Sequence, residues 1–270
     1  MAAPYVTPRT RVVLIAGSAA AVVAGIVVGV TLATRSDVEG PTVKAPPFVA
    51  DPTAPAEITR DVRDALASWP AGTVRRLRIL AARYPHNALV RLELGLALAF
   101  TGNETDASRA WHQARRVQPD SPSAVHATDL LHPNTPPGLT PFVPTFTQAR
   151  TPAQRHLLQG IAFQQALRPI SAEREFAEAA RLAPDDPEAL TAAAVGRYDK
   201  EQPQAAFSRL GPLARRFPHA QTVRFHLGLL LIFFGDIKQA KRQLTLARAE
   251  GPSTRLGTRA DTLLKAGRTG

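Results

Sequence analysis

The pattern of apolar and polar positions begins with an uncharged stretch from residue 12 to residue 34, VVLIAGSAAAVVAGIVVGVTLAT, between Arg11 and Arg35. At about 1.5 Å per residue, a helix of this length covers the roughly 30 Å hydrocarbon core of a bilayer. A cleaved signal peptide is the alternative, because residues 31–33 form an acceptable cleavage site, but its apolar region is normally only about 7–15 residues long. We therefore expect an uncleaved transmembrane helix over residues 12–34.

The residues around and within this stretch predict its orientation and its neighbours. Arg9 and Arg11 precede it, whereas the basic residues after it are diluted by acidic ones, so the positive-inside rule places residues 1–11 in the cytoplasm and the rest of the chain outside. Small side chains recur at every fourth position, namely Gly17, Ala21, Gly25 and Gly29. They would let a second helix approach closely, which predicts self-association, although an Ala/Gly-rich helix also produces such ladders by chance.

Beyond the apolar stretch, the chain divides into a linker and a series of helical segments. Residues 35–55 are rich in proline and lack a helical period, which predicts an extended spacer. From residue 56 onward, apolar residues recur with helical spacing, and a proline follows the helical stretches at regular intervals. These prolines are Pro85, Pro119, Pro184, Pro218 and Pro252. Three of the four intervals are 34 residues, the length of a helix-turn-helix tetratricopeptide unit.

Each 34-residue unit carries a second pattern, with small residues at positions 8, 20 and 27 and a large residue at position 24. The small residues would let two antiparallel helices approach, and the large one would fill the space between them. The unit at residues 88–121 shows the pattern through Gly95, Ala107, Trp111 and Ala114. Units at 153–186, 187–220 and 221–254 follow it too, although Leu213 replaces one small residue; 56–87 and 122–152 are degenerate, and 255–270 is a basic capping segment.

On these residues the chain resembles the tetratricopeptide repeat family, in its membrane-anchored bacterial form. Residues 83–96 and 216–229 also agree at most positions across a spacing of 133 residues, which indicates internal duplication. The resemblance implies an all-α fold in which an N-terminal transmembrane helix precedes an α-solenoid of stacked helix pairs. Five prolines between residues 132 and 147 forbid a continuous helix there. That loop either crosses the groove of the solenoid or is an ordinary surface excursion.

Composition changes this picture little. The chain has 270 residues, no cysteine and a net charge of +11, and most of its basic residues are scattered arginines among acidic residues. No nucleic-acid partner is expected on this pattern, but the basic C-terminal end leaves binding to anionic lipid or nucleic acid as the alternative function. The seven histidines include no close pair on a helix face, and no catalytic or phosphate-binding motif is present. We therefore expect no enzyme activity, no metal and no cofactor.

In the family that this chain resembles, the first helices of the units line a concave groove that holds a peptide or a helix of a partner protein. Carried over by position, the lining consists of Leu89, Leu92, Leu96, Phe100, Leu157, Ile161, Gln164, Tyr198, Phe225, Leu229 and Phe233. The lysines and asparagines of the family's carboxylate clamp are missing. The resemblance thus implies a scaffold at the cell envelope that binds a partly apolar segment of a partner protein, or an accessory subunit of a membrane enzyme complex.

Overall fold

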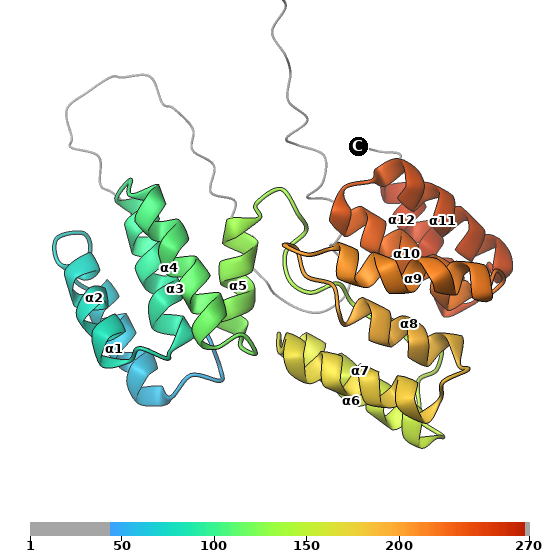
Figure 1. The fold of residues 1–270 in the computed structure, drawn as a ribbon. Coiled ribbons are helices and arrows are strands. Elements are labelled where there is room, and N and C mark those ends of the chain that lie inside the picture. The colour runs from blue at the N-terminus through green and yellow to red at the C-terminus, as the bar shows by residue number, and fades with distance from the viewer. Residues whose placement is uncertain (1–43, 268–270) are drawn as a thin grey trace, which may run out of the picture.

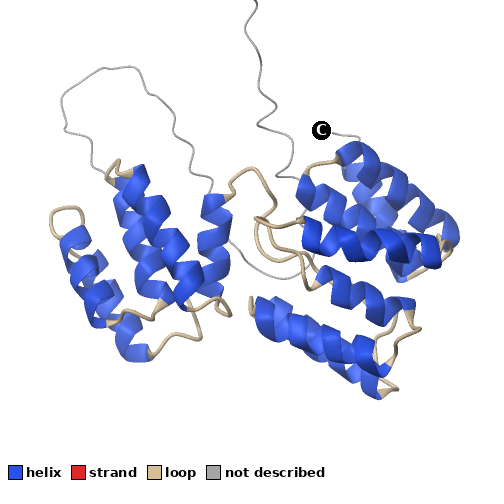
Figure 2. Cartoon of the chain, viewed as in Figure 1, coloured by secondary structure: helices blue, strands red, loops and turns tan. Residues whose placement is uncertain are grey.

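The computed structural model describes residues 44–267, and every regular element among them is a helix (Figures 1 and 2). The helices are α1 (Ala56–Leu66), α2 (Thr73–Arg83), α3 (Ala88–Phe100), α4 (Glu104–Val117), α5 (Pro122–Leu131), α6 (Pro152–Gln165), α7 (Pro169–Leu182), α8 (Pro187–Val195), α9 (Gln204–Arg216), α10 (Gln221–Phe234), α11 (Ile237–Glu250) and α12 (Arg255–Ala266). The expectation of an all-helical chain is confirmed for this part of the sequence.

Consecutive helices pack as pairs, and the pairs form two groups. The first group contains the pairs α1/α2 and α3/α4 and the single helix α5, and the second contains α6/α7, α8/α9 and α10/α11 followed by α12 (Figure 1). The first helices of neighbouring pairs also contact one another, as α6 contacts α8 and α8 contacts α10. A row of first helices therefore forms one continuous face in each group.

Local sequence explains where several helices begin. The side chains of Ser121, Thr151 and Asp186 each accept a hydrogen bond from a backbone N–H in the first turn of α5, α6 and α8, and each is followed by proline at the first helical position. Proline fits there because that N–H has no partner inside the helix, and a capping oxygen satisfies one of the other free donors. These three helix starts are therefore set by residues adjacent in sequence.

The contact between two helices of a pair depends on a glycine that faces a large side chain. A Cβ atom added to Gly95 would lie 2.3 Å from the Trp111 ring, and one added to Gly160 would lie 2.4 Å from the Phe176 ring. At Gly228 the nearest atom, in Leu244, would be 2.8 Å away. A side chain fits at these positions only if the facing residue shifts. Because the glycine has no side chain, the large residue can fill the space between the two backbones.

Polar contacts at three places join the groups: Asp120, Lys200, and Arg115 of α4, which pairs with Asp199 and Glu201 after α8. Asp120, between α4 and α5, accepts hydrogen bonds from the backbone N–H groups of Ile170 and Ser171 at the start of α7, both at 3.0 Å, and pairs with Arg168. Burial opposes ionisation, but the hydrogen bonds from Ser171 and Arg168 hold the pKa of Asp120 below its ordinary value. The carboxylate thus caps a helix of the other group.

The second contact between the groups is a nearly buried ion pair. Lys200, whose side chain is 4% exposed, pairs with Asp129 of α5 and donates a hydrogen bond to the carbonyl oxygen of Pro136 at 2.7 Å. Asp129 also accepts the backbone N–H of Gly138. The end of α5, the start of the following loop and the turn after α8 are therefore tied together.

The expected fold class and location require a correction. Residues 12–34, with Gly17, Ala21, Gly25 and Gly29, lie outside the described residues, and so does the predicted self-association through them. Within residues 44–267 no helix is both long and apolar enough to cross a membrane. The longest helices there have 14 residues, about 21 Å, against roughly 30 Å of hydrocarbon. Residues 44–267 are therefore all-helical without a membrane-spanning helix, which contradicts the expected fold class and the expected single-pass membrane location.

Candidate functional site

The side chains expected to line the groove lie mostly in the interior. Leu89, Leu92, Leu96, Leu157, Gln164, Phe225, Leu229 and Phe233 are buried, and Phe100, Ile161 and Tyr198 are half-buried. Tyr198 contacts the edge of Phe233, with 6.0 Å between ring centroids, and burial raises its pKa to about 12. The structure therefore brings Phe233 and Tyr198 together, while the remaining residues are spread over α3, α6 and α10.

Most of the groove in the second group is covered by the chain itself. Residues 140–145, here called the second strap, run in extended form along the inner face of the first helices and pass beside α8 (Figure 1). At α6, the side chain of Gln164 binds this strap at two points. Its Oε1 accepts the N–H of Phe142 and its Nε2 donates to the carbonyl oxygen of Thr140, both at 2.9 Å. One amide side chain therefore binds the backbone as a neighbouring β-strand would.

At α10 the strap is bound by a buried histidine. The N–H of Val143 donates to Nε2 of His226 at 2.9 Å, and Nδ1 of His226 donates to the carbonyl oxygen of Thr222 at 2.7 Å. The ring therefore carries its proton on Nδ1 and is neutral. Burial is the main reason that the pKa of His226 is lowered to about 4, and Arg259 adds to the effect. Protonation of Nε2 would remove the acceptor that Val143 uses.

At α8 the strap is bound by a carboxylate. The N–H and the hydroxyl of Thr145 both donate to Glu188, the hydroxyl at 2.7 Å. Burial raises the pKa of Glu188, whereas these two hydrogen bonds act in the opposite direction. Three first helices thus each contribute one polar side chain to the backbone of the second strap.

Apolar contacts complete the binding of the second strap. The Phe142 ring stacks on the His226 ring at 4.7 Å and meets the edge of Phe176 at 5.6 Å. Val143 belongs to the same buried cluster as Phe225 and Leu229. Phe142 and Val143 are each only 3% exposed. The predicted groove residues Phe225 and Leu229 are therefore covered by this strap.

The first group contains a matching segment, residues 46–51, here called the first strap. The N–H of Val49 donates to Oε1 of Glu93 on α3 at 2.7 Å, and Asp51 accepts the N–H of Ser123 at the start of α5 at 3.1 Å. Burial raises the pKa of Glu93 to about 8, against the hydrogen bond from Val49. The second carboxyl oxygen of Glu93 is buried and has no hydrogen-bond partner. Residues 46–51, expected to be part of a free spacer, are thus packed on the helices.

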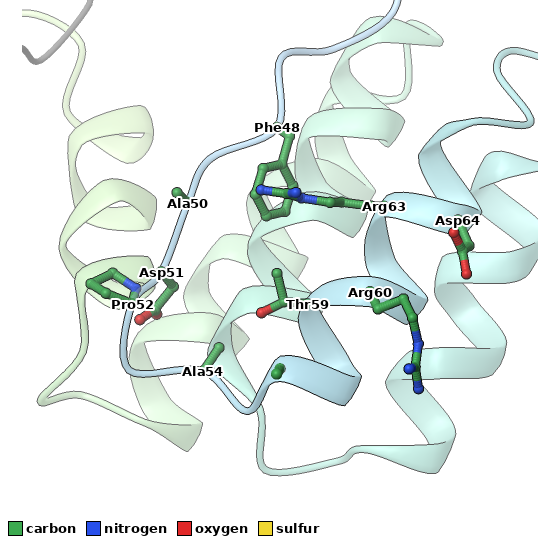
Figure 3. A pocket seen from close by; sticks show the side chains of 10 residues that line it. Phe48, Ala50, Asp51, Pro52, Ala54, Thr59, Arg60, Arg63 and Asp64 are labelled. Carbon is green, nitrogen blue, oxygen red and sulfur yellow. The ribbon is translucent and has the colours of Figure 1, made fainter.

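An open hollow of about 670 Å³ lies between the first strap and α1, beside the contact of Phe48 with the buried side chains of α1 (Figure 3). Its walls are formed by Phe48, Ala50 and Pro52 on one side and by Thr59 and Arg60 of α1 on the other. Figure 3 shows the guanidinium group of Arg63 lying over the Phe48 ring, 4.6 Å from its centroid. No hydrogen bond joins the first strap to α1 among the described residues.

The chemistry of both sites is that of backbone recognition. Side-chain acceptors are placed where an extended chain presents N–H groups, and aromatic rings enter spaces between helices. In residues 44–267, no group of three His, Asp or Glu side chains is placed to hold a metal ion. The arrangement binds an extended polypeptide backbone, which here is that of the chain's own two straps.

The loop of residues 132–147 follows the first of its two predicted alternatives, since it crosses the groove. Sequence reasoning did not decide between these alternatives and missed the first strap, although two signals were present. The tripeptide Pro-Phe-Val occurs at residues 47–49 and again at 141–143. Glu93 and His226 are polar residues within otherwise apolar helices, and they occupy equivalent positions in the duplicated segments 83–96 and 216–229. Together, these signals pair each strap with the side chain that binds its valine.

The basic C-terminal end remains partly without ionic partners. Arg248 and Lys265 both pair with Asp261. Within the described residues, Arg255 and Arg259 make no ion pair, and burial followed by the charge of Arg255 lowers the pKa of Arg259. This surface carries positive charge but lacks the enclosing contacts of the two straps.

Comparison with protein-family models finds no match to this chain, and comparison with curated proteins finds none either. The function therefore has to rest on the contacts described above.

Proposed function

We propose that this protein is a non-catalytic scaffold of the tetratricopeptide-repeat kind, which binds an extended segment of another protein along the inner faces of its first helices. The observation that carries the proposal is the binding of the second strap by Gln164, Glu188 and His226. Bonds to main-chain groups recognise extended conformation, and a pocket for one side chain adds sequence preference.

The energetics favour a peptide over a small molecule as the ligand. The polar groups of α6, α8 and α10 that bind the second strap are spread along three helices, and each meets a different residue of the extended chain. Phe142 fills an enclosed aromatic space, and a buried Phe side chain contributes about 1.5–3 kcal/mol relative to its exposed state. A ligand needs the length of a peptide to reach all of these groups at once.

The test removes the second strap from the groove and adds the same sequence as a separate peptide. Residues 140–145 are replaced by six Gly and Ser residues, and a synthetic peptide with the sequence of residues 137–148 is added. We expect saturable binding by calorimetry and a higher melting temperature with peptide than without it. A peptide with Phe142→Ala should bind at least about tenfold more weakly, because tenfold corresponds to only 1.4 kcal/mol and loss of a buried Phe costs about 3–5 kcal/mol.

A second variant controls for damage to the fold. If circular dichroism shows that the replacement unfolds the chain, the variant Phe142→Ser is used instead. Its second strap binds the groove more weakly and should be displaced by the peptide. Absence of peptide binding to a folded, vacated groove would reject the proposed function.

A further inference from the structure

We propose that the groove of α1, α3 and α5 is the site where a partner protein exchanges with the first strap, and that the partner presents an extended segment with the order proline, phenylalanine, β-branched residue. This inference rests on the proposed function and names both the groove and the chemistry of the partner.

The two straps show that this tripeptide is what the grooves recognise. Pro-Phe-Val stands at residues 47–49 and 141–143, and in both copies the valine N–H donates to the same position of a duplicated helix, Glu93 or His226. In both copies the phenylalanine lies against the helices, Phe48 under Arg63 and Phe142 against Phe176. Two occurrences of one sequence in one binding geometry indicate recognition of that sequence.

The first strap is the less firmly bound of the two. The second strap is hydrogen-bonded to all three first helices of its group that flank it, whereas the first strap is bonded to α3 and α5 and not to α1 among the described residues. Phe48 and Val49 are half-buried, while Phe142 and Val143 are 3% exposed. Release of the first strap therefore exposes less apolar surface and breaks fewer hydrogen bonds.

The first groove also contains a buried polar atom without a hydrogen-bond partner and an open hollow beside the strap. One oxygen of Glu93 is buried without a hydrogen-bond partner, on a side chain that is 0% exposed. At the equivalent position of the second groove both nitrogens of His226 are bonded, and the buried atom without a partner there is the hydroxyl of Thr140 on the strap itself. The open hollow of about 670 Å³ lies between the strap and α1, where Phe48 contacts α1 but no hydrogen bond joins the two segments (Figure 3). A partner segment can gain contacts here that residues 46–51 do not make.

The probe is a fluorescently labelled peptide with the sequence of residues 44–53, and the readout is anisotropy with the full chain. Val49→Pro removes the N–H that Glu93 accepts, and we expect this variant to bind the peptide at least about tenfold more tightly than the unchanged chain, because its own strap no longer competes. Adding Glu93→Leu to Val49→Pro should abolish the gain. The peptide with Phe48→Ala should fail to bind.

The matched control is Val143→Pro, which weakens the other strap and should give no gain for this peptide. Phe48→Ser is the second release variant, used if Val49→Pro fails to fold by circular dichroism. Equal binding to the unchanged and released chains, or a gain with Val143→Pro alone, would overturn the inference while leaving the proposed function intact.

Two further outcomes separate the remaining cases. A concentration-dependent dimer of the unchanged chain that is lost in Phe48→Ser would show that a second copy of this chain, and not a partner protein, occupies the groove. That result would overturn the inference. Failure of every peptide, including residues 137–148 on the vacated second groove, would reject the proposed function together with it.

Discussion

His226 is a wholly buried histidine that makes a hydrogen bond with each ring nitrogen. Such a residue in an apolar helix is destabilising unless both nitrogens are satisfied, since an unpaired buried polar group costs about 1–3 kcal/mol. Here Thr222 fixes the tautomer and Val143 supplies the donor. Nε2 of His226 and the N–H of Val143 thus satisfy each other, and each would be a buried polar group without a partner if the other were removed.

The pH dependence of stability follows from the lowered pKa of His226. The unfolded chain has the ordinary histidine pKa near 6.5, and the folded chain has about 4, so the unfolded state binds more protons between these values. The free energy of unfolding should therefore fall as pH drops from 6.5 towards 4, by at most about 3 kcal/mol. His226→Gln keeps an acceptor but does not titrate, and urea unfolding at several pH values compares the two proteins. A constant difference across this window would contradict the assignment of a neutral His226.

At the scale of the element, each helix pair is held at close range by a glycine opposite a large side chain. Gly160→Ala would place a methyl group 2.4 Å from the Phe176 ring, so we expect a loss of about 1–3 kcal/mol in the free energy of unfolding. Ser208→Ala is the control, because Ser208 is exposed in the middle of α9 and alanine there should be neutral or stabilising by up to about 0.5 kcal/mol. If the two changes lower the melting temperature equally, the close contact between Gly160 and Phe176 is not the cause of the lost stability.

The helix pairs could be predicted from the sequence because the residues that form them are adjacent in sequence or recur at a fixed period. Gly160 and Phe176 are 16 residues apart in one unit, and their contact follows from the pattern of small and large positions. The first strap was not predicted, and the crossing of the groove by residues 132–147 was left as one of two alternatives, because an extended proline-rich segment has no period of its own. Its position is set by side chains such as His226, 83 residues away from Val143. The groove residues were therefore named without the segment that covers them.

At the scale of the whole molecule, polar contacts of Asp120, Arg115 and Lys200 join the two groups of helices, and that of Lys200 is the most buried. Lys200→Ala would leave Asp129 with only the N–H of Gly138, so we expect a loss of about 2–3 kcal/mol and faster proteolysis of the loop after α5. Lys238→Ala is the control, since this lysine is exposed and makes no ion pair within the described residues. Calorimetric melts and limited trypsin digestion give the two readouts. Unchanged proteolysis after Lys200→Ala would show that the groups are held together by other contacts.

The order in which the second strap meets its helices has a consequence during synthesis on the ribosome. Val143 is made 83 residues before His226, and at roughly 5–20 residues per second about 4–17 seconds pass before its acceptor exists. Glu93 follows Val49 by only 44 residues. For those seconds the apolar Phe142 and Val143 can contact α6, α7 and α8 as these are made, but not α10. The nascent chain is therefore most exposed to aggregation, and to capture by chaperones, after its first group has folded and before α10 emerges.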